Sequence, residues 1–280
     1  MDKLNIGFLH PGEMGISLAA SAQNSGHIAY WASEGRSQDT RDRVTKFRLE
    51  DAQTIEDLCE KCPVIVSVCP PHAAEDVAAD VVKASFGGIY LDANAISPQR
   101  TLKIGRMMED AGIKFVDGGI IGMPAWEPGR TWLYLSGRER QVIAACFEGG
   151  PLETEVLGEE IGKASALKMC FAAYTKGTTA LLCALLAAAE KLGVREDLEK
   201  QWSRDGSDFA EKTKGQVRGV TAKAWRFAGE MEEIAATFGE AGVPKDFHLA
   251  ASEIYKRISH FKGLSERPSL KEVLEALIPS

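Results

Sequence analysis

Apolar residues are grouped in short blocks along the first half of the chain, and the spacing within each block predicts strands alternating with helices. The block 4–9 predicts a strand that runs into a glycine turn, and apolar positions then recur at helical spacing over 14–24. Ser25 and Gly26 end that helix, and the block 28–31 predicts a second strand. The amino terminus is therefore predicted to form a βαβ unit with two parallel strands.

The same alternation continues to about residue 147. It predicts strands over 63–69, 89–92, 114–117 and 132–136, the last of them closing the sheet, and helices over 72–83, from Pro98 onward and over 139–147. Ligands of open parallel sheets bind at the carboxyl ends of the strands. The loops that follow three of these strands, 69–72, 94–97 and 117–124, are therefore predicted to line a site.

The second half has a different pattern. Residues 162–192 are rich in Ala, Leu and Lys and predict one long helix that Gly193 ends, and the segments 222–242 and 246–260 also predict helices. A helix that is apolar on most of its faces needs cover from other helices or from another subunit. No strand pattern stands out here, so we expect an all-α domain.

The glycine turn after the first strand carries the first candidate chemistry. Gly12 and Gly15 occupy the second and third positions of a G-x-G-x-x-G fingerprint, and His10 stands at the first. Backbone N–H groups and the positive end of the helix dipole offer an anion site at such a turn. We expect Gly12, Glu13, Met14 and Gly15 to bind a dinucleotide pyrophosphate, although His10 makes the fingerprint imperfect.

The end of the second predicted strand bears on which dinucleotide is bound. Ser33 stands where NAD-binding chains usually place an acidic residue for the ribose 2′-hydroxyl, and Arg36 and Ser37 follow it. A guanidinium and a hydroxyl can hold a 2′-phosphate through charge-assisted hydrogen bonds. This predicts NADP(H), provided that Glu34 faces solvent. The alternative is that Arg36 is an ordinary solvated loop charge.

These patterns together predict an α/β Rossmann-type N-terminal domain over residues 1–158, which binds NADP, and an all-α C-terminal domain over residues 159–280. The length of 280 residues suits two domains, and 45% hydrophobic residues can fill a sizeable core. With 33 basic and 40 acidic residues the formal net charge is −7, and no long basic run occurs, so we expect neither nucleic acid nor an anionic membrane as a partner.

Targeting and metal signals are weak in this sequence. We find no signal-peptide pattern and no apolar stretch that we expect to span a bilayer, which predicts a cytoplasmic protein. Most of the six cysteines lie in apolar runs, as buried thiols do in a reducing compartment. Only Cys59 and Cys62 form a C-x-x-C pair, which lacks a second pair of zinc ligands, so we expect no metal site.

Four segments carry a resemblance to a known family. Residues 7–15 (GFLHPGEMG) match its G-F-I-G-L-G-x-M-G turn, and residues 91–98 (LDANAISP) match its D-x-S-T-x-x-P segment. Residues 115–124 (FVDGGIIGMP) fall where it has D-A-P-V-S-G-G, and residues 162–172 (GKASALKMCFA) match G-x-G-x-x-x-K-x-x-x-N. The chain thus resembles the β-hydroxyacid dehydrogenase superfamily, with 3-hydroxyisobutyrate and 6-phosphogluconate dehydrogenases, and most closely its subfamily with the DUF1932-type carboxy-terminal domain.

The resemblance implies hydride transfer between NADP(H) and a carbinol carbon, with Lys168 as the general acid or base. Burial beside a nicotinamide would lower the pKa of this lysine toward working pH; the alternative is a lysine that extends from its helix to solvent. Besides the turn residues, the cofactor contacts expected are Cys69, Pro70, Pro71 and Asn94. The substrate contacts expected are Asn94, Ile121, Gly122, Met123, Thr175, Lys176 and Arg226.

Three departures from the family pattern affect the substrate. Ala172 replaces the Asn four residues after the lysine, Ile121 replaces the Ser of the glycine-rich segment, and Gly229 stands where the family has a further lysine. The pocket is therefore expected to be less polar, which argues against a small carboxylated sugar acid. Arg226 could bind a carboxylate or phosphate, and the alternative is a surface ion pair with Glu230.

Three hypotheses follow for the function. The first is an NADP(H)-dependent dehydrogenase or reductase of a hydroxy acid or related carbonyl compound, a homodimer whose clefts are completed across subunits. The second is an imine reductase, which similar folds also support. The third is a non-catalytic NADPH-binding sensor.

Overall fold

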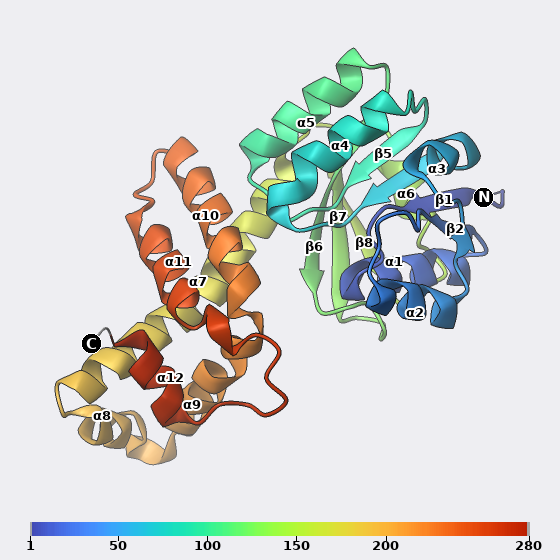
Figure 1. Ribbon diagram of the computed structural model, residues 1–280. Coiled ribbons are helices and arrows are strands. Elements are labelled where there is room, and N and C mark those ends of the chain that lie inside the picture. Colours follow the sequence, from blue (N-terminus) through green and yellow to red (C-terminus); the bar gives the residue numbers. More distant parts are fainter. Residues whose placement is uncertain (1, 279–280) are drawn as a thin grey trace. The chain divides into compact units, whose positions relative to one another are not determined.

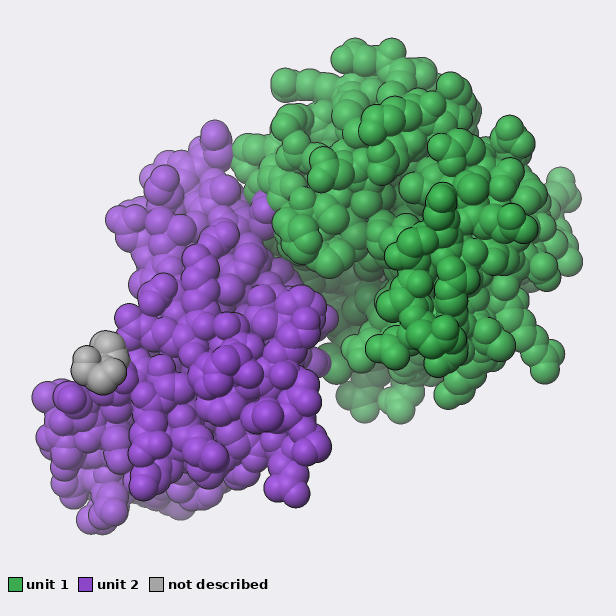
Figure 2. Space-filling view, viewed as in Figure 1, with its two compact units in different colours: residues 1–169 green, residues 170–280 purple. Residues whose placement is uncertain are grey.

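The computed structural model describes residues 2–278, and the chain divides into two compact units (Figure 2). Unit 1 comprises residues 1–169 and unit 2 residues 170–280. The division falls inside one long helix, α7 (Lys163–Lys191), whose first turns belong with unit 1. The boundary predicted after residue 158 lies at the end of the last strand of unit 1, just before this helix.

Unit 1 is built on an eight-stranded sheet with the order β3-β2-β1-β4-β5-β6-β7-β8 (Figure 1). The strands are β1 (Asn5–Phe8), β2 (Ile28–Trp31), β3 (Glu50–Asp51), β4 (Val64–Ser67), β5 (Ile89–Asp92), β6 (Lys114–Gly122), β7 (Thr131–Ser136) and β8 (Glu153–Gly158). Neighbouring strands are parallel except β6 and β7, which form an antiparallel pair. The order reverses between β1 and β4, and this reversal is the ligand position of a doubly wound sheet.

The helices of unit 1 cover both faces of this sheet. They are α1 (Glu13–Asn24), α2 (Gln38–Phe47), α3 (Ile55–Lys61), α4 (Ala74–Lys83), α5 (Pro98–Asp110) and α6 (Arg140–Ala145), with a 3₁₀ turn, η1 (Pro71–Ala73), before α4. Each helix buries apolar side chains against the strands beneath it, as the alternation of strand and helix requires.

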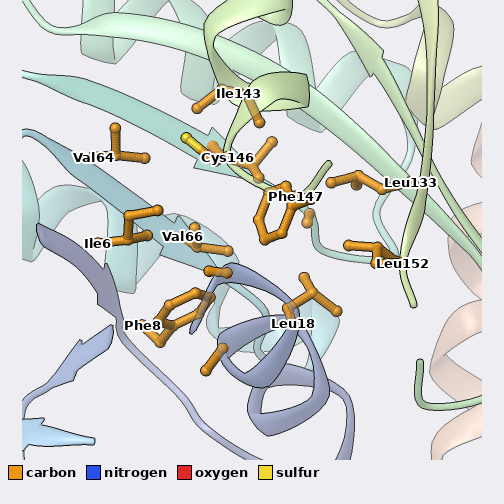
Figure 3. Packing of buried hydrophobic residues seen from close by; sticks show 14 of the residues in the cluster. Ile6, Phe8, Leu18, Val64, Val66, Leu133, Ile143, Cys146, Phe147 and Leu152 are labelled. Carbon is orange, nitrogen blue, oxygen red and sulfur yellow. The ribbon is translucent and has the colours of Figure 1, made fainter. Parts of the chain in front are cut away.

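The two cores of unit 1 follow from the alternation of side chains along each strand. In one core, Ile6 and Phe8 of β1 pack with Leu18 of α1 and with Ile143 and Phe147 in and after α6 (Figure 3). In the other, side chains of the opposite strand face pack under α3, α4 and α5; they include Ile65, Tyr90, Leu58, Val81 and Ile104. The sheet is thus buried on both faces, which explains why β4 and β5 are apolar without alternation.

Most of the predicted architecture is confirmed. The Rossmann-type fold followed by helices is present, and β2 and β5 have the predicted bounds. Two expectations about the sheet are wrong. The strand over 131–136 is not the last, because β8 follows it, and residues 117–122 are part of β6 rather than a loop. The strand was predicted too short because Gly118 and Gly119 interrupt the apolar pattern, and glycine is uncommon inside strands.

Unit 2 contains only helices within residues 170–278. After α7 come α8 (Arg195–Trp202), α9 (Phe209–Val220), α10 (Ala224–Glu240), α11 (Asp246–Arg257) and α12 (Leu270–Leu277), with the 3₁₀ turns η2 (Arg204–Gly206), η3 (Thr221–Lys223) and η4 (Ser259–Phe261). Met231 and Ile234 of α10 and Tyr255 of α11 are fully buried in this unit. A capping box of Ser269 and Glu272 begins α12.

The length of α7 corrects one sequence expectation. By length and composition, this 29-residue helix could cross a membrane, whereas no such apolar stretch was expected from the sequence. Half of its most apolar window is buried inside the protein. One helix of this kind is weak evidence for a membrane span, because the core helix of a globular domain has the same composition.

Candidate active site

The glycine turn after β1 leaves the start of α1 open. Gly12 is the N-cap of α1, and no side chain caps the helix. A Cβ at Gly12 would meet nothing within 4 Å, whereas a Cβ at Gly15 would lie 2.4 Å from the carbonyl oxygen of His10. Gly15 therefore permits the close packing of helix on turn, and Gly12 leaves room for an anion to reach the N–H groups of the first helical turn.

His10 lies in the glycine turn after β1, and Arg36 lies in the loop after the neighbouring strand β2. Among the described residues, neither the buried Nδ1 of His10 nor the buried Nε of Arg36 has a hydrogen-bond partner. Burial and the charge of Arg36 lower the pKa of His10 to about 4, so its imidazole is neutral at pH 7. Because buried polar atoms are normally paired, this pair fits a ligand that carries an acceptor, such as a phosphate.

The other residues predicted around the 2′-phosphate are partly engaged by the protein. The carbonyl oxygen of buried Ser33 accepts a hydrogen bond from Arg41 Nη2 (2.7 Å), and Ser37 caps α2 by accepting from the Thr40 N–H (3.4 Å). Glu34 is exposed to solvent. The Nε of Arg36 is therefore a buried donor in this loop that no described residue uses.

Asn94 ties the carboxyl ends of β4 and β5 together. Its Oδ1 accepts from the Cys69 N–H (2.6 Å), its Nδ2 donates to Ser67 Oγ (3.1 Å), and its own N–H donates to Asp92 Oδ1 (3.0 Å). The side chain is buried, so it shapes the loop containing Cys69, and a direct contact with cofactor or substrate stays a prediction.

The other predicted residues of that loop, Cys69, Pro70 and Pro71, supply no reactive group. Pro70 is exposed and Pro71 begins η1. Burial raises the pKa of the Cys69 thiol to about 12, which keeps it protonated and unreactive as a nucleophile. The same holds for the C-x-x-C pair, because burial raises the pKa of Cys59 and of Cys62 to about 12. Within residues 2–278 no group of three metal-binding side chains lies together.

Asp92, at the end of β5, was not singled out from the sequence. It is buried, and its Oδ2 has no hydrogen-bond partner in the described part of the chain. Burial raises the pKa of this carboxyl to about 7, although the hydrogen bond from Asn94 acts in the opposite direction. The available signal was an acidic residue directly after the apolar run 89–91, because a run without alternation is typical of a strand that is buried on both faces.

Lys168 lies half-buried in the second turn of α7, next to β6. A Cβ at Gly119 would lie 2.4 Å from the carbonyl oxygen of Ala164 and 3.2 Å from the Cβ of Lys168. The missing side chain at Gly119 thus allows α7 to lie directly on the strand. This contact brings Lys168 beside β6.

The three substrate residues predicted around 121–123 lie at the end of β6. Ile121 is buried within the strand, paired with Trp132 of β7, and so does not belong to the loop in which it was expected. Gly122 has φ +137°, and a Cβ there would lie 2.4 Å from the carbonyl oxygen of Arg130, so this position requires glycine. Met123 is exposed, and its carbonyl oxygen accepts from Thr131 Oγ1 (2.5 Å). Of the three, Met123 offers an accessible side chain.

Thr175, Lys176 and Arg226 lie in unit 2. Thr175 Oγ1 donates to the carbonyl oxygen of Phe171 (3.2 Å), and the ammonium of Lys176 pairs with Glu230 while lying 4.8 Å from the centre of the Phe227 ring. Arg226 is exposed beside the same ring, and Glu230, its alternative ion-pair partner, is taken by Lys176. Lys176 therefore has a structural role in this unit; contacts of the three residues with substrate stay predictions.

Asp92 makes a testable contribution to stability. The folded chain keeps this proton up to about pH 7, whereas an unfolded chain loses it near pH 4, so the free energy of unfolding falls as the pH rises between these values. Asp92→Asn removes this titration. In urea unfolding, its stability relative to the natural protein should rise by up to roughly 4 kcal/mol between pH 4 and pH 8. A difference independent of pH, like that expected of exposed Asp110→Asn, would contradict this.

Family models match two parts of the chain. Residues 5–143 match the NAD binding domain of 6-phosphogluconate dehydrogenase, and residues 189–258 match a domain of unknown function, DUF1932. The first match contains the glycine turn, Arg36 and Asp92. The second lies within unit 2.

Two curated proteins are similar over most of the chain. An uncharacterised protein of Methanothermus fervidus is 29% identical over 232 residues, which cover 82% of this chain and 89% of that protein. The mitochondrial 3-hydroxyisobutyrate dehydrogenase of Drosophila melanogaster is 24% identical over 272 residues, covering 88% of this chain and 76% of that protein.

Solved structures share the fold along nearly the whole chain. A conserved protein of unknown function, described as structurally similar to 3-hydroxyacid dehydrogenases, is 29% identical, with a TM-score of 0.67 and coverage of 92% and 99%. The 3-hydroxyisobutyrate dehydrogenase of Mycobacterium tuberculosis gives 0.73 at 15% identity, covering 99% of both chains. A reductive aminase of Aspergillus terreus, in complex with NADPH, gives 0.58 at 16% identity, covering 98% and 99%.

Proposed function

Because the chain belongs to the β-hydroxyacid dehydrogenase superfamily and carries both of the matched domains, we propose that it is an NADP(H)-dependent oxidoreductase of a hydroxy acid or related carbonyl compound. An NAD(P)-binding domain and an oxidoreductase fold are common to its relatives. The observation that carries the preference for NADP(H) is the buried, unpaired Nε of Arg36 beside the unpaired Nδ1 of His10.

The residues of unit 1 suit each part of this cofactor. Gly12 leaves the first turn of α1 accessible to a pyrophosphate. Arg36 can donate to a 2′-phosphate, and neutral His10 can donate to it as well in the tautomer that carries the proton on Nδ1. Ser33 offers no carboxylate, so nothing at that position repels the phosphate.

Lys168 is proposed to move the proton that accompanies hydride transfer. A bound nicotinamide supplies or accepts the hydride at the substrate carbon. In the oxidative direction the amine of Lys168 takes the hydroxyl proton as the carbonyl forms, and in the reductive direction its ammonium returns a proton to the forming alkoxide. The contact with Gly119 keeps this lysine beside the glycine-rich strand.

An imine reductase is the second candidate. Ile121 and Ala172 are buried apolar residues where the related dehydrogenases have polar ones, which favours a less polar substrate than a sugar acid. Turnover of a cyclic imine with NADPH, and none of hydroxy acids or keto acids, would select this candidate. If no alcohol, carbonyl or imine is turned over while NADPH binds, the protein is a cofactor-binding sensor.

Arg36 should decide which nicotinamide nucleotide is bound. Arg36→Ala should weaken NADPH binding by about 10- to 100-fold, because a hydrogen bond to a charged group contributes roughly 1.5–3 kcal/mol. NADH has no 2′-phosphate, so its dissociation constant should change by less than about threefold. Calorimetric titration measures both, with the exposed Lys46→Ala as a matched loss of charge. Equal losses for the two nucleotides would contradict the assignment.

Lys168 should be required for turnover and not for cofactor binding. Lys168→Ala should lower kcat by about 10²- to 10⁴-fold, the usual contribution of a general acid or base, with NADPH affinity unchanged within about threefold. Lys163→Ala, at the exposed first residue of the same helix, is the control and should retain activity. Steady-state turnover and cofactor fluorescence provide the two readouts. Full activity in Lys168→Ala would end the proposal for this residue.

We also propose a homodimer in which two copies of α7 meet. In unit 2 one row of exposed residues on this helix follows at intervals of three and four: Phe171, Tyr174, Thr178, Leu181, Leu185, Ala188 and, just after the helix, Leu192. Mostly apolar residues at this spacing form the contact seam of paired helices. Tyr174 and Leu192 are 72% and 75% exposed, so a single chain leaves this seam open to water.

Charged residues in this seam should prevent dimer formation. The double variant Leu181→Glu, Leu185→Glu places two carboxylates in the centre of the seam and should convert dimer to monomer, because unpaired charges cannot be buried in such a contact. Sedimentation velocity measures the mass. Leu264→Glu, at a loop residue that is 56% exposed, adds a comparable charge outside the seam and should leave the dimer intact. A natural protein that sediments as a monomer would refute the dimer.

A further inference from the structure

Asp117, on β6, is a buried carboxylate surrounded by hydrogen-bond donors. Its Oδ2 accepts from Ser136 Oγ (2.9 Å) and from the N–H groups of Gly162 (2.9 Å), Ala164 (3.0 Å) and Ser165 (3.2 Å). Its Oδ1 accepts from Ser165 Oγ (2.6 Å). Burial raises the pKa of this carboxyl, whereas the hydrogen bonds lower it. Because all these partners can donate, the ionised carboxylate satisfies them together.

These bonds make Asp117 the cap of α7, supplied from a strand. The first N–H groups of a helix have no partner within the helix, and a side chain at the preceding residue usually accepts from them. Gly162 precedes α7 and has no side chain to do so. The carboxylate of Asp117, 45 residues earlier in the chain, takes that place. The negative charge also lies at the favourable end of the helix dipole.

The cap fixes the position of the start of α7 along the strands of the sheet. In the register of the strands, Asp117 pairs with Asp92 of β5, which pairs with Ser67 of β4, so the three residues lie at one level. This is the level at which β4 and β5 end and the ligand loops begin. Ser165 Oγ also hydrogen-bonds Thr101 Oγ1 of α5 (2.8 Å), which ties the same turn to a second element.

The turn that carries Lys168 directly follows the capped first turn. Lys168 follows Ala164 by four residues and so lies on the same face of the helix. Gly119 follows Asp117 by two residues on the same face of β6, and Ala164 and Lys168 contact the strand there. One strand thus holds the helix by its end through Asp117 and by its side through Gly119.

Building on the function proposed for Lys168, we propose that Asp117 is a positioning residue, which anchors the first turn of α7 to β6 and so holds the lysine amine at the reacting position. It acts through the helix and does not touch the substrate. A displacement of about 1 Å in a reacting group can lower a rate by roughly 10²-fold, so a loosened cap should affect the chemical step more than binding.

The experiment combines exchange and kinetics in the full-length protein. Asp117→Asn keeps the volume but directs one amide nitrogen at the donors. In hydrogen exchange followed by mass spectrometry, the amides of the first turn of α7 should exchange at least about tenfold faster, because loss of an acceptor weakens the turn. Its kcat should fall by about 10- to 100-fold, with KM and NADPH affinity within about threefold of the natural values.

Two further variants keep the proposal testable if Asp117→Asn folds poorly. Ser165→Ala removes the 2.6 Å bond but keeps the carboxylate and its backbone bonds, and should show a smaller effect in the same direction on exchange and kcat. Lys163→Ala changes an exposed side chain of the same turn and should alter neither.

The outcomes separate the cap from the function of Lys168. Unchanged exchange in both Asp117→Asn and Ser165→Ala would overturn the anchoring, whatever the activity. Faster exchange with unchanged kcat, in a protein whose kcat depends on Lys168, would overturn the positioning. If Lys168→Ala retains full activity, the function proposed for the lysine fails, and the exchange result still decides whether Asp117 anchors the helix.

Discussion

The direct contact between a helix and a strand organises the site of unit 1. At Gly119 the backbone of β6 approaches the backbone of α7 so closely that a methyl group there would lie 2.4 Å from a carbonyl oxygen. Such an approach is possible only without a side chain, and it is stable only if the buried polar groups nearby find partners. The carboxylate of Asp117 meets that second requirement for the start of the helix. Two neighbouring positions of one strand therefore supply the space and the hydrogen bonds.

Unit 1 contains seven buried polar side-chain atoms that lack hydrogen-bond partners within the described chain, and three of them belong to residues at or after the ends of strands of the sheet. The Nδ1 of His10, the Nε of Arg36 and the Oδ2 of Asp92 are buried near the carboxyl ends of β1, β2 and β5. An unpaired buried polar atom destabilises a folded protein by about 1–3 kcal/mol. This edge of the sheet is where open parallel sheets bind ligands, and local features that cost stability are common at functional sites.

The sequence was sufficient for the fold because its strongest signals are local. The helix of α1 begins at a glycine turn and β5 is an uninterrupted apolar run, so both were predicted closely. It was insufficient where local preference and tertiary structure disagree. Gly118 and Gly119 weaken the strand pattern of β6, yet the strand forms because its neighbours β5 and β7 pair with it on both sides. The partially exposed β8 gave no comparable apolar run.

The sequence predicted which residues form the candidate site, but it could not predict their hydrogen-bond and ion-pair partners. Lys176 was predicted because it follows Lys168 by eight residues and so lies on roughly the same face of the helix. Only the folded structure shows that Glu230, 54 residues away, binds its ammonium. Asn94 was placed correctly at the end of β5, and its amide proved to link that strand to β4. Asp117 was quoted within a motif and given no role, because a cap supplied across 45 residues leaves no pattern in the local sequence.

The continuity of α7 has a consequence for how such a protein can change over evolution. Many two-domain proteins are joined by a loop, where recombination can exchange one domain for another with little disturbance. Here the division between the units falls within a helix about 43 Å long, so a crossover there must preserve helical phase. An insertion of a single residue would rotate everything beyond it by about 100°. New activities in such a chain are therefore more easily reached by point substitution than by shuffling of modules.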